Sequence, residues 1–116
     1  METQKLVKNI YLNVADDFGD APGGRYRKDG DLSGEEFYDD FLRPKFEQAL
    51  LSKTTLIVNL DKVWGFPVSF ISESFGKLSS KFGKNRVNQY IKLISRDEPL
   101  LVKEVSAVID NPNFRG

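Results

Sequence analysis

The residue of this chain best placed to do chemistry is Ser69. It lies at the end of the segment Trp64–Phe70, after the apolar run Thr54–Leu60 and before apolar residues at helical spacing. A serine between a strand and a helix is placed to be the helix N-cap, where its hydroxyl accepts a backbone N–H. A phosphate on that hydroxyl would meet free N–H groups and the positive end of the helix dipole. Two interpretations therefore stay open, a structural cap and a phosphoacceptor, and the neighbours Ser72 and Ser74 weaken any single assignment.

A second candidate is a glycine-rich segment with a basic cluster. Guanidinium groups beside glycines can hold a phosphate or an acidic partner, although the P-loop spacing GxxxxGK[ST] is absent. The alternative is an ordered structural loop whose arginine pairs with Asp16, Asp17, Asp20 or Asp31. The candidates for loop or anion binding are Gly23, Gly24, Arg25, Tyr26 and Arg27.

Acidic residues follow this segment closely. Paired carboxylates can do acid–base work or hold a divalent metal, yet Glu35 and Glu36 in a first helical turn are expected for dipole and capping reasons alone. We therefore expect no catalytic residue, no metal site and no cofactor from the cluster, which comprises Asp29, Asp31, Glu35, Glu36, Asp39 and Asp40.

Aromatic side chains accompany Ser69 in its segment. Exposed aromatic residues dominate the energetics of many interfaces, so Trp64 and Phe66 could anchor a partner, and core packing is an equal alternative for either. The candidates for partner binding are Trp64, Phe66, Phe70 and Glu73.

Composition excludes several function classes. The chain has 116 residues with 17 Lys+Arg, 17 Asp+Glu, no His and no Cys, which predicts a single domain over residues 1–116. Without Cys or His there is no thiolate nucleophile, no disulfide and no serine–histidine pair. Balanced charge argues against a nucleic-acid partner. The polar start Met1–Asn9 and the lack of a long apolar run predict no signal peptide and no membrane partner, so we expect a cytoplasmic protein.

The elements that must position these residues alternate between strand and helix. Strands are predicted at Leu6–Val14, at Thr54–Leu60 as a central strand buried on both faces, and at Val87–Ile94. The long connection Ala15–Leu32 reads as a loop, with a short strand or turn at 23–26.

Three helices are predicted between and after the strands. The first begins at a capping box, Ser33 with Glu36, and should be kinked or split at Pro44. The second runs from about Ser69 to Phe82, and the third opens at Pro99 with Leu101, Val105, Val108 and Ile109 toward the core. This order predicts an α/β fold, a single small domain with a mostly parallel sheet of about four strands.

Four short motifs follow one another along the chain: Pro22–Tyr26 (PGGRY), Ser33–Phe37 (SGEEF), Leu42–Pro44 (LRP) and Ser69–Leu78 (SFISESFGKL). Together they resemble a STAS-like domain family once catalogued as a domain of unknown function, itself distantly similar to the STAS domains of anti-sigma factor antagonists. Lys77 stands where the family usually has a second glycine.

The resemblance implies a regulatory interaction module rather than an enzyme. In anti-sigma factor antagonists a serine at this place is phosphorylated by a partner ATPase with a histidine-kinase-like fold, and Ser69 falls at that position. Here Pro67-Val68-Ser69-Phe70 replaces the usual Asp-Ser-Ser-Gly, so the acidic residue and the glycine are missing.

Three functional hypotheses follow. The first is a module that docks a protein partner, such as a histidine-kinase-like ATPase or another regulator, with Ser69 as a phosphorylation switch. The alternative is a small enzyme or phosphate-binding protein that uses Arg25 and the nearby carboxylates. A third is a structural subunit of a larger assembly. The sequence specifies no oligomeric state.

Overall fold

The computed structural model describes residues 9–112 and has a parallel sheet at its centre. The strands are β1 (Ile10–Asn13), β2 (Leu56–Asn59) and β3 (Ile91–Ile94), in the order β1-β2-β3 with both pairs parallel. The α/β class and the central position of β2 are confirmed. The described residues form three strands where about four were predicted.

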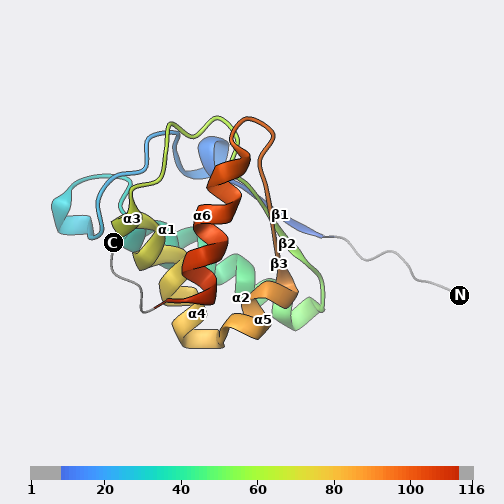
Figure 1. Cartoon of the computed structure of the whole chain (residues 1–116). Helices are drawn as coiled ribbons and strands as arrows, with labels where there is room; N and C mark the ends of the chain where they lie inside the picture. Colours follow the sequence, from blue (N-terminus) through green and yellow to red (C-terminus); the bar gives the residue numbers. More distant parts are fainter. Residues whose placement is uncertain (1–8, 113–116) are drawn as a thin grey trace, which may run out of the picture.

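Helices fill the connections and pack on one side of the sheet (Figure 1). Several of them contain π-helical turns, in which the backbone bonds span five residues. In chain order the helical segments are η1 (Val14–Phe18, π), η2 (Arg27–Asp29, 3-10), α1 (Gly34–Phe37), η3 (Tyr38–Leu42, π), α2 (Arg43–Ser52), α3 (Val68–Ile71), η4 (Ser72–Gly76, π), α4 (Lys77–Phe82), α5 (Lys84–Tyr90) and α6 (Pro99–Asp110).

The first long helix, residues 34–52, begins where the sequence predicts. The Ser33 hydroxyl accepts the Glu36 N–H at 3.1 Å, which is the first half of the predicted capping box. Pro44 does not split the helix. Instead the Arg43 N–H donates to the Tyr38 carbonyl, five residues back, so a widened π turn lies directly before the proline and the helix continues.

The prediction of the third strand is wrong for its first half and confirmed for its second half. Val87–Tyr90, predicted as strand, belongs to α5, and only Ile91–Ile94 pairs with β2. Gly83 has a φ of 92°, a left-handed conformation that ends α4 and starts α5, and its carbonyl accepts the Val87 N–H at 3.0 Å. Val87 is fully buried, but beneath helices rather than in the sheet.

The sheet is covered on one face only. Leu12, Leu56 and Val58 point to the helices and are buried, whereas Tyr11 and Lys92 on the opposite face are exposed. On β2 itself the residues of that outer face, Ile57 and Asn59, are half-buried, so the expected burial of β2 on both faces is wrong. Parallel crossovers are right-handed, and two successive steps in one direction place both connections on the same face.

The bounds and buried residues of the other two predicted helices are confirmed closely. The segment from α3 to α4 runs continuously over residues 68–82 and ends at Gly83. In α6 Pro99 is the first residue, and the four residues predicted to face the core are all buried. Of the predicted first strand, Leu6–Lys8 lie outside the described residues. The segment 23–26 is irregular backbone rather than a strand.

Candidate functional site

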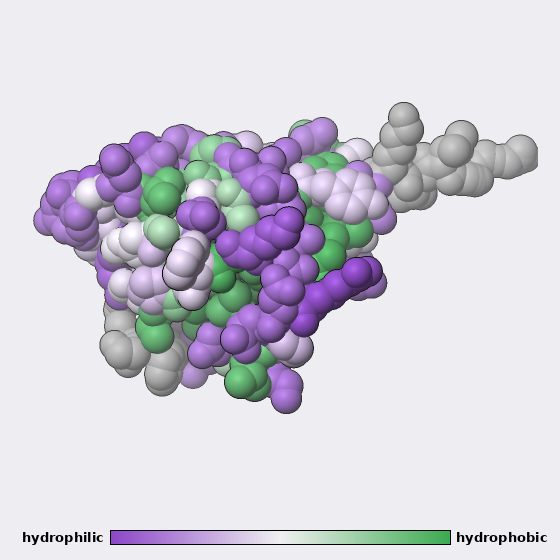
Figure 2. Space-filling model, turned by 90° about the horizontal axis from the view of Figure 1, so that it is seen from above, coloured by the Kyte–Doolittle hydropathy of each residue, from purple (hydrophilic) through white to green (hydrophobic). Residues whose placement is uncertain are grey.

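The carboxyl edge of the sheet carries the loops that hold the candidate residues. Figure 2 looks down on this edge, where apolar patches lie beside hydrophilic side chains. The loop 60–67 follows β2, and its Trp64 N–H donates to the Asp20 carbonyl at 2.8 Å, which fastens it to the preceding long connection. The Trp64 side chain itself is 86% exposed. The loop backbone is thus held while its largest apolar side chain faces solvent.

Two adjoining hollows lie between this loop and α6, and both include Phe66 and Glu104. We call the two together the docking groove. One hollow, of about 530 Å³, has Phe66, Val68, Ile71, Glu104, Val108 and Asp110 among its lining residues. The other, of about 500 Å³, includes Trp64, Phe66, Asp97, Glu98, Leu100 and Glu104. Val68 and Leu100 are exposed, so the groove presents an apolar surface with carboxylates around it.

Of the four partner-binding candidates, two lie at this groove, one lies in the interior, and Glu73 lies outside the groove in ion pairs with Arg25 and Lys77. Trp64 stands at the rim, and Phe66, only 8% exposed, forms part of the floor. Phe70 is fully buried, stacks on Phe66 with ring centroids 5.3 Å apart and packs on Phe37, so it cannot contact a partner. That part of the prediction is wrong, because Phe70 belongs to the aromatic core.

Ser69 is not the N-cap of its helix. Pro67 has an extended ψ of 145° and its carbonyl accepts the Ile71 N–H at 3.1 Å, so α3 begins at Val68. Ser69 is therefore the second helical residue, partly exposed and next to Val68 of the groove. Among residues 9–112 its hydroxyl makes no hydrogen bond. The dipole argument for a phosphate still holds in the first turn, whereas the capping interpretation is wrong.

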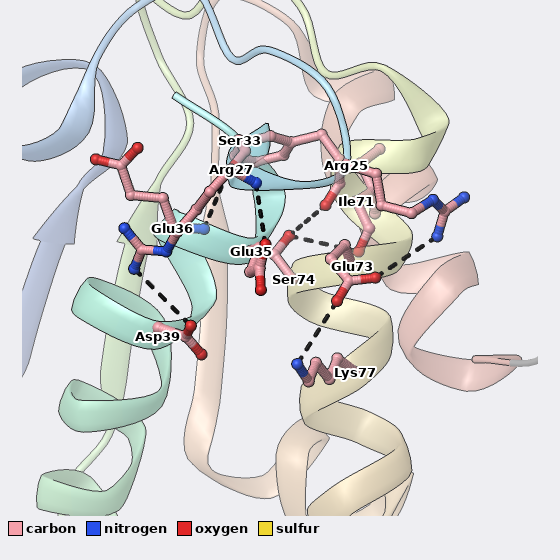
Figure 3. Close-up of polar contacts among 11 residues, drawn as sticks. Arg25, Arg27, Ser33, Glu35, Glu36, Asp39, Ile71, Glu73, Ser74 and Lys77 are labelled. Carbon is pink, nitrogen blue, oxygen red and sulfur yellow. Dashed lines mark hydrogen bonds and ion pairs between the residues drawn. The ribbon is translucent and has the colours of Figure 1, made fainter. Parts of the chain in front are cut away.

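The glycine-rich loop is tied to the helices beneath it (Figure 3). Arg25 lies 3.7 Å from one carboxylate oxygen of Glu73, whose other oxygen lies 3.5 Å from Lys77. The Gly34 N–H donates to the Gly24 carbonyl at 2.9 Å. The structural interpretation of Arg25 thus gains support, but its partner is Glu73 rather than Asp16, Asp17, Asp20 or Asp31.

Arg27 is engaged with the first helix. Its guanidinium lies 3.1 Å from Asp40 and 3.8 Å from Asp39, and its backbone N–H donates to Glu35 at 2.9 Å. The hydrogen bond to Asp40 raises the pKa of Arg27 above its ordinary value. Tyr26, the last of the loop candidates, has its ring beneath Lys28, 5.7 Å from the centroid.

Two glycines of the motifs are required by close packing. A Cβ on Gly34 would lie 2.8 Å from the Phe70 carbonyl oxygen, and one on Gly23 would lie 2.6 Å from that of Asp31. The first contact joins α1 to α3, and so brings Glu73 within reach of Arg25. Lys77, at the position where the family usually has glycine, is exposed and its ammonium lies over the Tyr38 ring.

Two polar groups of the structure, Asp61 and Tyr38, are absent from the residues predicted from the sequence. One Asp61 oxygen accepts the backbone N–H groups of Arg96 and Asp97, at 2.7 and 3.0 Å, and the Ser95 hydroxyl at 3.0 Å. These bonds, that of Asp97 first, lower the pKa of Asp61. Asp61 directly follows the predicted strand Thr54–Leu60, and its position at a strand end was a signal available in the sequence. The Tyr38 hydroxyl is buried without a partner in the described part of the chain, and burial raises its pKa.

Neither a metal cluster nor a membrane-spanning helix is found in the described part of the chain. Within residues 9–112 no three acidic side chains converge closely enough to hold a metal ion. None of the helices in that range combines the length with the apolar composition needed to cross a bilayer.

Comparison with known proteins identifies the family to which the chain belongs. No curated protein and no solved structure matches the chain significantly. The family model described as "STAS-like domain of unknown function (DUF4325)" matches residues 33–101, which span α1 to the start of α6. That range contains the SGEEF, LRP and SFISESFGKL motifs, and the PGGRY motif precedes it. The chain therefore belongs to the STAS-like domain family of unknown function.

Proposed function

We propose that this chain is a regulatory protein-interaction module that binds its partner at the docking groove. The observation that carries the proposal is Trp64, whose backbone is hydrogen-bonded to Asp20 while its side chain is 86% exposed. It lines the hollow that adjoins, through Phe66, the apolar hollow beside α6. Tryptophan is enriched among residues that dominate binding energy, and apolar surface of this kind commonly marks an interaction site.

The partner we propose is an ATPase with a histidine-kinase-like fold, as the similarity to anti-sigma factor antagonists suggests. Ser69 would be its phosphoacceptor. The side chain is partly exposed in the first turn of a helix, directly beside Val68 of the groove. A phosphate there would add nearly two negative charges one residue from Val68 of the groove, and so would change the affinity of any charged partner.

The alternative, a phosphate site at Arg25, has less support. A guanidinium that binds a ligand must be free to approach it, whereas Arg25 is paired with a half-buried Glu73 that also holds Lys77. The carbonyl groups of Gly24 and Arg25 accept helix N–H groups, so this loop also serves to hold the start of α1.

A binding experiment tests the docking surface. The full chain is titrated by calorimetry with each ATPase encoded next to its gene. Trp64→Ala should weaken the complex at least tenfold, because it removes the largest exposed apolar side chain. The matched control is Leu51→Ala, another exposed apolar residue at the end of α2, which should leave affinity unchanged. Equal affinities of the wild type and Trp64→Ala would contradict this docking surface.

Intact mass tests the switch separately. After incubation with ATP and an ATPase that binds, we expect one phosphate adduct, lost in Ser69→Ala and kept in Ser80→Ala, where the serine is also exposed. An adduct that persists in Ser69→Ala, or no adduct in a complex that does form, would exclude Ser69 as the switch and leave the docking proposal intact.

A further inference from the structure

We infer that the docking groove accepts an amphipathic helix of the partner, with lysine or arginine residues flanking its apolar face. This inference rests on the proposed function and names the chemistry of the segment that would bind.

The floor and walls of the groove are apolar at its centre. Phe66 and Ile71 form the floor with Val108 of α6, while Val68, Leu100 and Trp64 stand exposed above it. The hollow of about 530 Å³ is large enough for one or two leucine or phenylalanine side chains. An occupant must therefore carry apolar anchors along one side.

The rim of the groove is acidic. Glu104 lies on the shared border of the two hollows, Asp97 and Glu98 lie at the upper end, and Asp110 lies at the lower end. Within residues 9–112 none of these four carboxylates is in an ion pair, and Asp110 accepts a hydrogen bond only from Asn88, at 3.0 Å. Lys62 is the single cation among the described lining residues.

The negative charge is confined to the side of α6 that faces the docking groove. Lys103, next to Glu104 in the chain, lines a different hollow with Arg96, beside β3. Complementary charge steers association and excludes wrong partners. The excess of carboxylate at the docking groove therefore favours an occupant with positive charge on both sides of its apolar anchors.

The walls of the groove favour a helix over a strand. No residue of β1 or β3, the edge strands, lines either hollow, so an extended peptide would find no strand edge with which to pair. A helix satisfies its own backbone groups and needs only side-chain contacts. The twelve residues of α6, Pro99–Asp110, span about 18 Å at ~1.5 Å per residue, which matches a partner helix of about twelve residues.

The test uses three synthetic peptides of fourteen residues and the single tryptophan of the chain as reporter. The basic peptide has leucines at i, i+3, i+4 and i+7 with lysine and arginine beside them. The acidic peptide replaces each cation with glutamate, and the third is a scramble of the first. Because Trp64 is exposed, docking of the basic peptide should shift its emission to the blue, and added salt should weaken binding.

A matched pair of double variants tests the acidic rim. Glu104→Gln with Asp110→Asn should weaken the basic peptide about tenfold. Asp40→Asn with Glu47→Gln removes the same net charge from exposed sites on η3 and α2 and should leave affinity unchanged. Thermal melting of each variant confirms that it is folded.

Several outcomes would overturn the inference. Equal binding of the basic and acidic peptides, no binding of either, or equal loss in both double variants would each do so. A groove filled by a second copy of the chain, detected by sedimentation as a dimer that Trp64→Ala dissociates, would also overturn it. If an ATPase binds through Trp64 while the Glu104 and Asp110 substitutions change nothing, the proposed function stands and the basic helix is excluded.

Discussion

At the scale of single residues, the contact between Arg25 and Glu73 shows why the glycine-rich loop looks functional in the sequence. Arginine next to glycines is typical of anion sites, and the pattern alone cannot name the anion. In the structure the anion is a carboxylate of the chain itself, forty-eight positions away. Such a pairing depends on the close packing of α1 on α3 at Gly34, which local sequence does not encode.

Removal of Arg25 should therefore affect stability rather than partner binding. Arg25→Ala leaves Glu73, whose side chain is only 16% exposed, with Lys77 as its remaining ion-pair partner among the described residues. We expect a loss of about 1 kcal/mol in the free energy of unfolding, measured in urea. Lys28→Ala is the control, since Lys28 is exposed and its ammonium lies over the Tyr26 ring without an ion pair among the described residues.

The same pair of variants discriminates between functions. Arg25→Ala should bind the partner of the docking groove as the wild type does. If Arg25→Ala weakened partner binding without loss of stability, the structural role of Arg25 would be contradicted. That result would favour the hypothesis that this loop binds a ligand.

At the scale of elements, local sequence signals located most helices. They failed where a helix passes directly into a strand within one continuous segment. The serine cap, Pro99 and the apolar spacing of α6 act within one or two turns, so they could be interpreted from the sequence. The segment Val87–Ile94 contains several residues of high β propensity, yet its first half is helical. The reason is that a new helix, which buries Val87, begins after Gly83. Burial of an apolar residue does not by itself distinguish the two states.

The turn from β3 into α6 depends on a single carboxylate. Asp61, just after β2, accepts two backbone N–H groups and one hydroxyl from Ser95–Asp97. This turn places Glu98 and Leu100 at the docking groove, so the bonds of Asp61 support the geometry of the candidate site.

The lowered pKa of Asp61 predicts how stability depends on pH. A group whose pKa is lower in the folded state stabilises the fold above its unfolded pKa and loses this effect as pH falls through the folded value. Asp61→Ala should therefore melt at a lower temperature than the wild type at pH 7, and the difference should shrink below about pH 4. Calorimetric melts between pH 2.5 and 7 measure this. A difference that stays constant over the range would show that the carboxylate charge is not responsible.

At the scale of the whole molecule, the sheet has one face on the helices and one face without helices from the described residues (Figure 1). The sequence predicted the parallel class correctly from the alternation of elements. The sequence could not predict that helices cover only one face of the sheet, because the run TTLIVNL is as apolar as a strand that is buried on both faces. Cover depends on strand order, and the order β1-β2-β3 sends both crossovers to the same side.

Adjacent residues on β1 allow this asymmetry to be measured. Leu12 is buried under the helices and Tyr11 is 65% exposed on the other face, next to Ile57 in the register. Leu12→Ala should cost about 2–5 kcal/mol in the free energy of unfolding, from lost burial and the cavity left behind. Tyr11→Thr keeps the β propensity and should cost less than about 1 kcal/mol. Urea unfolding of the two variants gives both values. Equal losses would contradict the one-sided cover, whereas the predicted difference would leave β1 to β3 with a single core on the helical side.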